Sequence, residues 1–147
     1  MSVHALLLAV ILTISLPYSN ASFAHASHCE DSHLGEHMKQ MKTELKALKA
    51  AIVLEKWESI TSHRKTLSSL VAQAENEEPL ILHDIYDQDE KEKKHNAYKR
   101  EIQVLADYLV NLEQAVLNKD ISKTKALFDK IAKHSKRSHK QFRKDCK

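Results

Sequence analysis

Two segments of the sequence repeat large apolar residues at alternating spacings of four and three positions. The first segment carries Leu34, Met38, Met41, Leu45, Leu48 and Ile52, and the second carries Tyr98, Ile102, Leu105, Leu109, Leu112 and Val116. On a helix of 3.6 residues per turn, this spacing places every member of a set on one face. The sequence therefore predicts two long amphipathic helices, over about 33–53 and 92–117.

Two further helices follow from shorter patterns. One covers about 56–75 and ends before the segment Asn76-Glu77-Glu78-Pro79; its inner side carries Trp57, Ile60, Leu67, Val71 and Ala74. The other covers about 121–144 after an Asp120 cap; its inner side carries Ile121, Phe128, Ile131, Ser135, His139 and Phe142. A long connection containing Leu80-Ile81-Leu82 joins the second helix to the third, and one helical turn is expected within it.

A chain with one Gly and two Pro has little material for the turns of a sheet protein. The expected fold is therefore all-α, and four amphipathic helices with short first and third turns predict an up-down-up-down antiparallel four-helix bundle. Residues 27–147 suffice for one such domain. In this topology the start of the first helix and the end of the last lie at the same pole.

Residues 1–26 are expected to be a secretory signal peptide. An uncharged apolar run extends from Ala5 to Leu16, too short to span a bilayer, and Ala24-His25-Ala26 offers a cleavage site, with Ala21 as the alternative. The net charge of +3 arises from interspersed Lys, Arg, Asp and Glu, which disfavours nucleic-acid binding. The mature chain is expected to be an exported, periplasmic, soluble monomer without stable membrane association.

The chain has two cysteines, Cys29 before the first helix and Cys146 after the last. In an oxidising compartment such a pair is more often a disulfide than a metal site, and the predicted topology brings both ends to one pole. A Cys29–Cys146 disulfide is therefore expected. The alternative is a pair of unlinked cysteines in frayed termini.

The same topology brings Met38 and His139 to similar depth on facing helices, because they lie nine and seven residues inward from the two cysteines. A thioether and an imidazole that meet in a bundle suit the two axial sites of a haem iron. The small Ser135, and Ser138 beside it, would leave room for a flat macrocycle. The alternative is that Met38 fills the core and His139 is a hydrogen-bonded boundary residue.

A family resemblance favours the haem interpretation. LGEHMKQMKTELKAL, residues 34–48, resembles the opening of the soluble cytochrome b562 family, whose L-x-x-x-M-x-x-x-x-x-x-L methionine is an axial ligand; Met38 matches it. The ending resembles the family's H-x-x-aromatic-R pattern, in which His139 takes the place of the second ligand. The similarity covers about residues 33–144 and is strongest at the two ends.

The resemblance implies one non-covalent haem b whose iron is ligated by Met38 and His139. The expected cofactor-binding residues also include Leu34, Met41, Tyr98, Ile102, Ser135 and Phe142; Ile102 stands where the family has an aromatic residue. There is no C-x-x-C-H motif for covalent attachment. With both axial sites filled, the implied function is one-electron transfer to an unknown redox partner protein, not enzymatic catalysis.

Two haem-free functions are the alternatives. The N-terminal part of the mature chain is rich in possible copper or zinc ligands, namely His25, His28, Cys29, His33, His37, Met38 and Met41, although no spacing among them is a recognised site. A stress-related helical binding protein is the other alternative. His63 and His134 are expected at the boundary or surface of the bundle.

Overall fold

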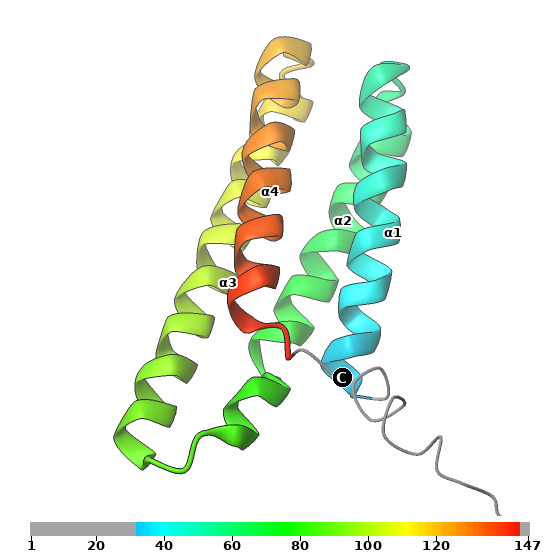
Figure 1. Cartoon of the computed structure of the whole chain (residues 1–147). Helices are drawn as coiled ribbons and strands as arrows, with labels where there is room; N and C mark the ends of the chain where they lie inside the picture. The colour runs from blue at the N-terminus through cyan, green and yellow to red at the C-terminus, as the bar shows by residue number, and fades with distance from the viewer. Residues whose placement is uncertain (1–31, 145–147) are drawn as a thin grey trace, which may run out of the picture.

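The computed structural model describes residues 32–144, which form a four-helix bundle (Figure 1). The helices are α1 (His33–Val53), α2 (Trp57–Glu75), α3 (Gln88–Leu117) and α4 (Ile121–Phe142), and a short 3-10 helix, η2 (Leu80–Asp84), lies between α2 and α3. Residues 32–144 contain no strand. The predicted all-α, up-down-up-down antiparallel bundle is confirmed.

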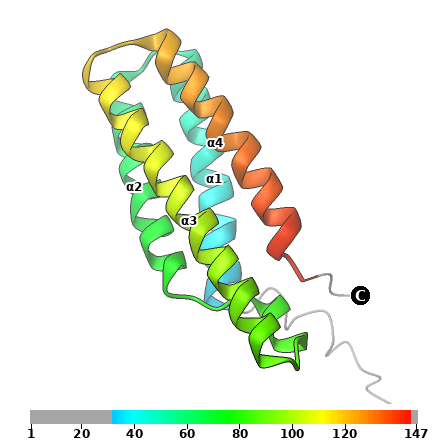
Figure 2. The ribbon, with the colours of Figure 1, turned by 90° about the vertical axis from the view of Figure 1, so that its left-hand side faces the viewer.

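The four helices do not pack equally. α1 packs along α2, α2 along α3 and α3 along α4, whereas contact between α4 and α1 is much less extensive. The beginning of α1 and the end of α4 lie at the same pole, at the bottom of Figure 1. Seen from the side, α4 diverges from α1 toward this pole (Figure 2). The seam between α1 and α4 is therefore the open side of the bundle.

Three helices begin at side-chain caps. The side chain of Ser32 accepts a hydrogen bond from the Gly35 N–H, that of Asp87 from the Glu90 N–H, and that of Asp120 from the Lys123 N–H. The Asp87 cap explains why α3 begins at Gln88, four residues before the predicted start near 92, because it satisfies an N–H group of the first turn. α4 ends at Phe142 instead of near 144.

The two short turns contain a left-handed residue that is not glycine. Glu55, between α1 and α2, has φ 52°, and Lys119, between α3 and α4, has φ 51°. Each turn reverses the chain within three residues, as an antiparallel pair of neighbouring helices requires. The absence of Gly left the first turn unmarked in the sequence, although this backbone conformation is the one that Gly favours.

The core follows the two long apolar stripes. All six residues of the α3 stripe are buried, from Tyr98 to Val116. In the α1 stripe, Met38 and Leu45 are only half-buried, whereas the other four members are buried. Met38 and Leu45 lie on the edge of α1 that faces the open seam.

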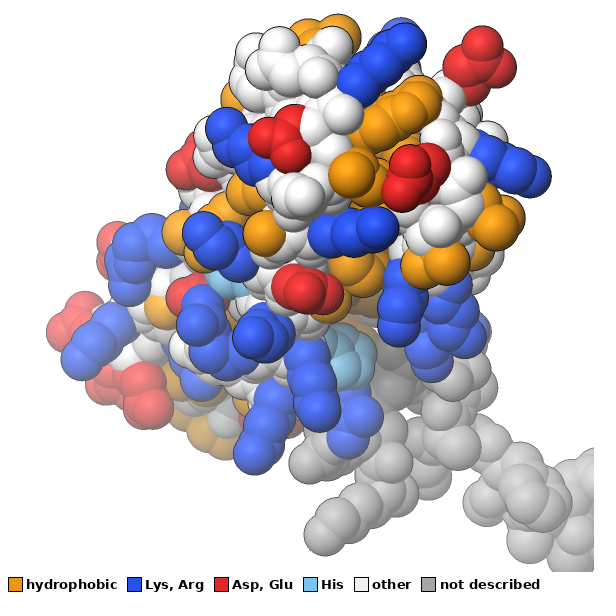
Figure 3. Space-filling model, turned by 90° about the horizontal axis from the view of Figure 1, so that it is seen from above, with side chains coloured by type: hydrophobic (Ala, Val, Ile, Leu, Met, Phe, Trp, Pro, Cys, Tyr) orange, Lys and Arg blue, Asp and Glu red, His pale blue; other side chains and the backbone are white. Residues whose placement is uncertain are grey.

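The pole opposite the termini exposes several apolar side chains. Val53, Leu54 and Leu117 are more than half exposed there, and Figure 3 shows hydrophobic side chains among charged ones when the bundle is seen from this end. No helix in residues 32–144 has the apolar length needed to cross a membrane.

Substitution Asp120→Ala should destabilise the bundle by about 1 kcal/mol, because it removes the acceptor that caps the Lys123 N–H at 2.9 Å. Urea unfolding followed by circular dichroism measures the loss. The matched control is Lys123→Ala, which keeps the cap and should change the free energy of unfolding by less than about 0.5 kcal/mol. Equal effects of both substitutions would show that the cap contributes nothing.

Candidate functional site

Met38 lies on the edge of α1 that faces α4. The opposite edge is identified by Glu44, whose carboxylate contacts Nδ1 of His63 in α2 at 2.8 Å. Six residues separate Met38 from Glu44, which places their side chains about 120° apart around the helix axis. Met38 therefore projects on the side away from α2, and the half-buried Leu45 lies on the same side, two turns further along.

His139 lies on the edge of α4 that faces α1. The α3-facing edge of α4 is identified by His134, whose Nε2 is 2.8 Å from the backbone oxygen of Glu101 in α3. Five residues separate His134 from His139, which places the two side chains about 140° apart. Ser135, one turn before His139, is half-buried on the same side. His139 itself is exposed to solvent.

Met38 and His139 thus occupy facing edges of the seam at one pole. Met38 is five residues from the first residue of α1, and His139 is three residues from the last residue of α4. At a rise of 1.5 Å per residue, Met38 lies about 7.5 Å from the start of α1 and His139 about 4.5 Å from the end of α4. Both residues therefore lie within two turns of the helix ends at this pole, a thioether on α1 and an imidazole on α4.

The interior of this pole is apolar. Leu34, Met41, Tyr98, Ile102 and Phe142 are all buried. The ring of Phe142 meets that of Tyr98 edge-on with centroids 5.5 Å apart, and the Tyr98 hydroxyl donates a hydrogen bond to the backbone oxygen of Ala74 at the end of α2. Burial raises the pKa of Tyr98 well above its usual value, so this hydroxyl remains a donor. Five of the predicted cofactor-binding residues therefore form one apolar wall.

His134 is not a surface residue. The sequence places it at the boundary or surface, but its side chain is 4% exposed and packs edge-on against Tyr108 with ring centroids 5.7 Å apart. Its Nε2–H donates to the Glu101 carbonyl, and Arg137 donates to its Nδ1 at 3.1 Å. The buried surface of α4 is wider than the stripe through Ile121, Phe128, Ile131, Ser135, His139 and Phe142, and it includes His134. The spacing Leu127, Ile131, His134, Ser138 marks the other edge.

The carboxylate of Glu101 collects further hydrogen bonds from α4. Its Oε2 accepts from Arg137 at 3.2 Å and from the Ser138 hydroxyl at 3.0 Å. Partial burial raises the pKa of this carboxyl, but the hydrogen bonds and positive charge of Arg137, together with the Ser138 hydroxyl and His134, lower it more, so the net shift is downward. Glu101 therefore fastens α4 to α3 through residues directly beside His139, a connection that the sequence did not reveal.

His33 and His37, the two N-terminal histidines that the structure describes, belong to no metal site in residues 32–144. Within residues 32–144, no group of three or more His, Cys, Asp or Glu side chains could hold a metal ion. Nδ1 of the half-buried His37 has no hydrogen-bond partner in this part of the chain, and His33 is exposed. His25, His28 and Cys29 lie outside the described residues, as do the predicted signal peptide and both cysteines of the predicted disulfide.

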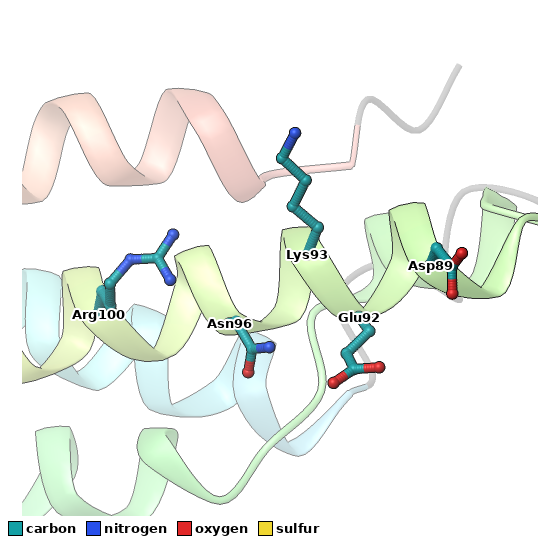
Figure 4. Close-up of a pocket in the computed structure, with 5 residues that line it drawn as sticks. All are labelled: Asp89, Glu92, Lys93, Asn96 and Arg100. Atoms are coloured by element: carbon teal, nitrogen blue, oxygen red, sulfur yellow. The ribbon is translucent and has the colours of Figure 1, made fainter.

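Two shallow surface depressions lie elsewhere. One follows the outer side of α3 and is lined by Asp89, Glu92, Lys93, Asn96 and Arg100, whose side chains diverge from a single helix (Figure 4). The other lies between α1 and α2 and is lined by Lys39, Gln40, Thr43, Glu44, Thr66 and Leu70. Neither includes Met38 or His139, and the first mixes opposite charges without a converging set of donors or acceptors.

Comparison with protein families decides the relationship. Residues 33–143 match the family model described as cytochrome b562. The chain belongs to the cytochrome b562 family. Comparison with curated proteins and with solved structures gave no match. The family match spans all four helices of this cytochrome b562 relative, and it points to a b-type haem cytochrome.

The residues at the open seam fit a haem. A soft thioether and an imidazole are the donor pair that a low-spin haem iron accepts, and both lie on facing edges of α1 and α4. The buried wall formed by Leu34, Met41, Tyr98, Ile102 and Phe142 matches the apolar faces of a porphyrin. Ser135 contributes little volume where the two helices separate. This donor set and its surroundings suit haem b at this pole of a cytochrome b562 relative.

The stabilising effect of Glu101 should depend on pH. Because its folded-state pKa is lowered from the ordinary value of 4.5 for a glutamate, its contribution is fully present above pH 4.5 and is lost as the pH falls through the folded-state pKa. The variant Glu101→Gln should therefore be less stable than the parent at pH 6, and the difference should shrink as the pH falls below 4.5. Urea unfolding at a series of pH values measures this.

The matched control for this experiment is Glu92→Gln, an exposed residue of the same helix with no ion pair in residues 32–144. Its free energy of unfolding should stay close to that of the parent at every pH. If Glu101→Gln behaved in the same way, Glu101 would not fasten α4 to α3.

Proposed function

We propose that this member of the cytochrome b562 family is an exported b-type cytochrome that carries one electron at a time. The proposal is supported above all by the placement of Met38 and His139 on facing edges of the α1–α4 seam, at the pole where the buried aromatic and aliphatic residues gather. Family membership supports haem b as the cofactor, and the placement of Met38 and His139 supports these two residues as its ligands.

The sulfur of Met38 and the imidazole of His139 would be the two axial ligands of the iron. When bound, the haem supplies reversible exchange of one electron between its Fe(III) and Fe(II) states. With Met38 and His139 both bound to the iron, no coordination position would remain for oxygen or a substrate. Electron transfer without catalysis is therefore the proposed activity.

The remaining residues would hold and shield the cofactor. Leu34, Met41, Ile102 and Phe142 supply apolar surface, and Tyr98 is oriented by its hydrogen bond to Ala74. The small Ser135 is proposed to leave space at the seam. The two cysteines at positions 29 and 146 form no C-x-x-C-H motif, so the haem is proposed to be bound without a covalent link.

Residues 1–26 are proposed to direct export to the periplasm, where the protein would act as a soluble monomer. The first and last described residues lie at the same pole (Figure 1), which supports a disulfide between Cys29 and Cys146, three residues before Ser32 and two after Lys144. Such a bridge would tie the start of α1 to the end of α4 on the open side of the bundle.

A copper or zinc function through the N-terminal His and Met residues is the alternative. In residues 32–144, this alternative is supported only by Nδ1 of His37, which is buried without a hydrogen-bond partner there. The same residues contain no group of three His, Cys, Asp or Glu side chains that could hold a metal ion. The electron-carrier proposal accounts for more of the structure, because it assigns a role to Met38 on the α1 edge of the seam and to His139 on the α4 edge.

Haem titration tests the ligand pair. The purified protein should bind one equivalent of haemin, and its reduced spectrum should show sharp alpha and beta bands of a six-coordinate low-spin haem. Met38→Ala and His139→Ala should each give a five-coordinate spectrum and weaker binding, because one axial bond is lost. Acidified acetone should extract the haem completely if it is not covalently attached.

The controls are Met41→Leu and His95→Ala, which change a methionine and a histidine at other positions of the same pole. Both variants should keep the six-coordinate spectrum. The electron-carrier proposal would be abandoned if the parent protein failed to bind haemin, or if the Met38→Ala and His139→Ala spectra matched that of the parent.

The disulfide has a separate test. In the chain-entropy model, a loop of more than one hundred residues contributes about 4–5 kcal/mol to stability. The melting temperature of the parent should therefore fall when a reductant is added, whereas Cys29→Ser should melt at the lower temperature under both conditions. Identical melting of the parent with and without reductant would rule out a stabilising bridge.

A further inference from the structure

Charge is divided unequally between the two sides of the bundle. α4 carries seven Lys or Arg residues and one acidic residue, and α1 carries four lysines and two glutamates. Residues 57–117, which comprise α2, η2 and α3, instead carry twelve acidic and seven basic residues. Figure 3 shows Lys and Arg side chains gathered toward the lower edge of the bundle as seen from the pole opposite the termini. The open side is therefore the basic side.

The basic residues on this side surround the seam that holds Met38 and His139. Lys42 lies one turn after Met38 on the same side of α1, while Lys136 and Arg143 lie about one turn before and after His139 on α4. Lys42, Lys136 and Lys140 are exposed and form no ion pair with another residue in the 32–144 range. Their charges therefore act on whatever approaches the seam.

The dipole of α4 favours Lys140, which lies in its last turn, but helix dipoles do not account for the basic residues elsewhere in α1 and α4. A cation is favoured only near the last turn of a helix and is disfavoured near the first. Lys123 and Lys125 nevertheless lie in the first turns of α4, and Lys39 lies in the first half of α1. Lys130 and Lys133 lie in the middle of α4, beyond the reach of either helix end. Crowding of like charges on one side disfavours the folded chain, and a ligand of opposite charge relieves this repulsion.

We propose that the basic face of α1 and α4, defined by Lys42, Lys46, Lys49, Lys136 and Lys140, is the docking surface for an acidic redox partner protein. This inference rests on the proposed electron-carrier function and names the chemistry of its partner. Complementary charge would steer the partner to the seam, where the distance to the haem is shortest. A protein fits this face better than a lipid surface, because its exposed residues include no large apolar side chain to insert into a bilayer.

The first test needs no haem. A fluorescein-labelled peptide of about ten glutamates serves as the acidic probe, and its anisotropy is followed as the haem-free full chain is added at low ionic strength. The double variant K136E/K140E should bind the peptide about tenfold more weakly or worse. The matched control K65E/K99E, which reverses two exposed lysines of α2 and α3, should bind within about twofold of the parent.

The second test uses haem-loaded protein in its reduced form. One electron passes from haem Fe(II) to the oxidant, leaving haem Fe(III) and the oxidant reduced by one electron. With anionic hexacyanoferrate(III), K136E/K140E should react about tenfold more slowly than the parent; with cationic tris(phenanthroline)cobalt(III), it should react faster. K65E/K99E should change neither rate by more than about twofold, and added salt should reduce all these differences.

The outcomes separate the two proposals. Failure to bind haemin would contradict the electron-carrier function, while the peptide experiment would still measure how strongly the basic face binds an acidic partner. Normal haem binding with equal effects of K136E/K140E and K65E/K99E would overturn the docking surface. A third outcome would also overturn the docking surface for a protein. If the parent bound phosphatidylglycerol vesicles more strongly than the peptide at equal ionic strength, and K136E/K140E abolished vesicle binding, this face would bind a membrane.

Discussion

The position of α4 depends on the hydrogen bonds that Glu101 makes across the α3–α4 interface. The carbonyl of this residue holds His134, and its carboxylate holds Arg137 and Ser138, so that one α3 residue fixes three positions of α4 within five residues. These bonds turn His134 toward α3 and, by helical geometry, turn His139 toward α1. No comparable polar connection to α1 is found in residues 32–144, and there the two helices separate.

This asymmetry gives the bundle a closed side and an open side. On the closed side, polar pairs such as Arg64–Glu113 at 2.7 Å and His63–Glu44 at 2.8 Å connect α2 to its neighbours, and acidic residues predominate. On the open side, Met38 of α1 and His139 of α4 lie on the edges of their helices that border the seam, and exposed lysines lie near them. A cofactor that bridges Met38 and His139 would supply the attraction that α1 and α4, both basic, do not provide for each other.

The helices were predictable because their signals are local. Alternating spacings of four and three, a cap such as Asp120 and a break such as Pro79 act within one or two turns, so the chain reveals them without its partners. The α3 start was missed because Gln88 to Lys91 carry no apolar periodicity and begin the helix through the Asp87 cap alone. The buried His134 was missed because a histidine gives no hydrophobic signal, and its partner Glu101 lies 33 residues away.

The sequence by itself determined the number of helices and the apolar stripes of α1 and α3, since periodicity is a property of each segment alone, and it is the source of the proposal that Met38 and His139 bind a haem iron. Only the tertiary structure decided how far α4 turns about its own axis, that Glu101 holds it there, and that His139 remains exposed while Met38 is half-buried. The physical reason is that the rotation and separation of packed helices depend on the sum of contacts between segments far apart in the sequence. Small differences in those contacts determine against which neighbour a helix packs most closely.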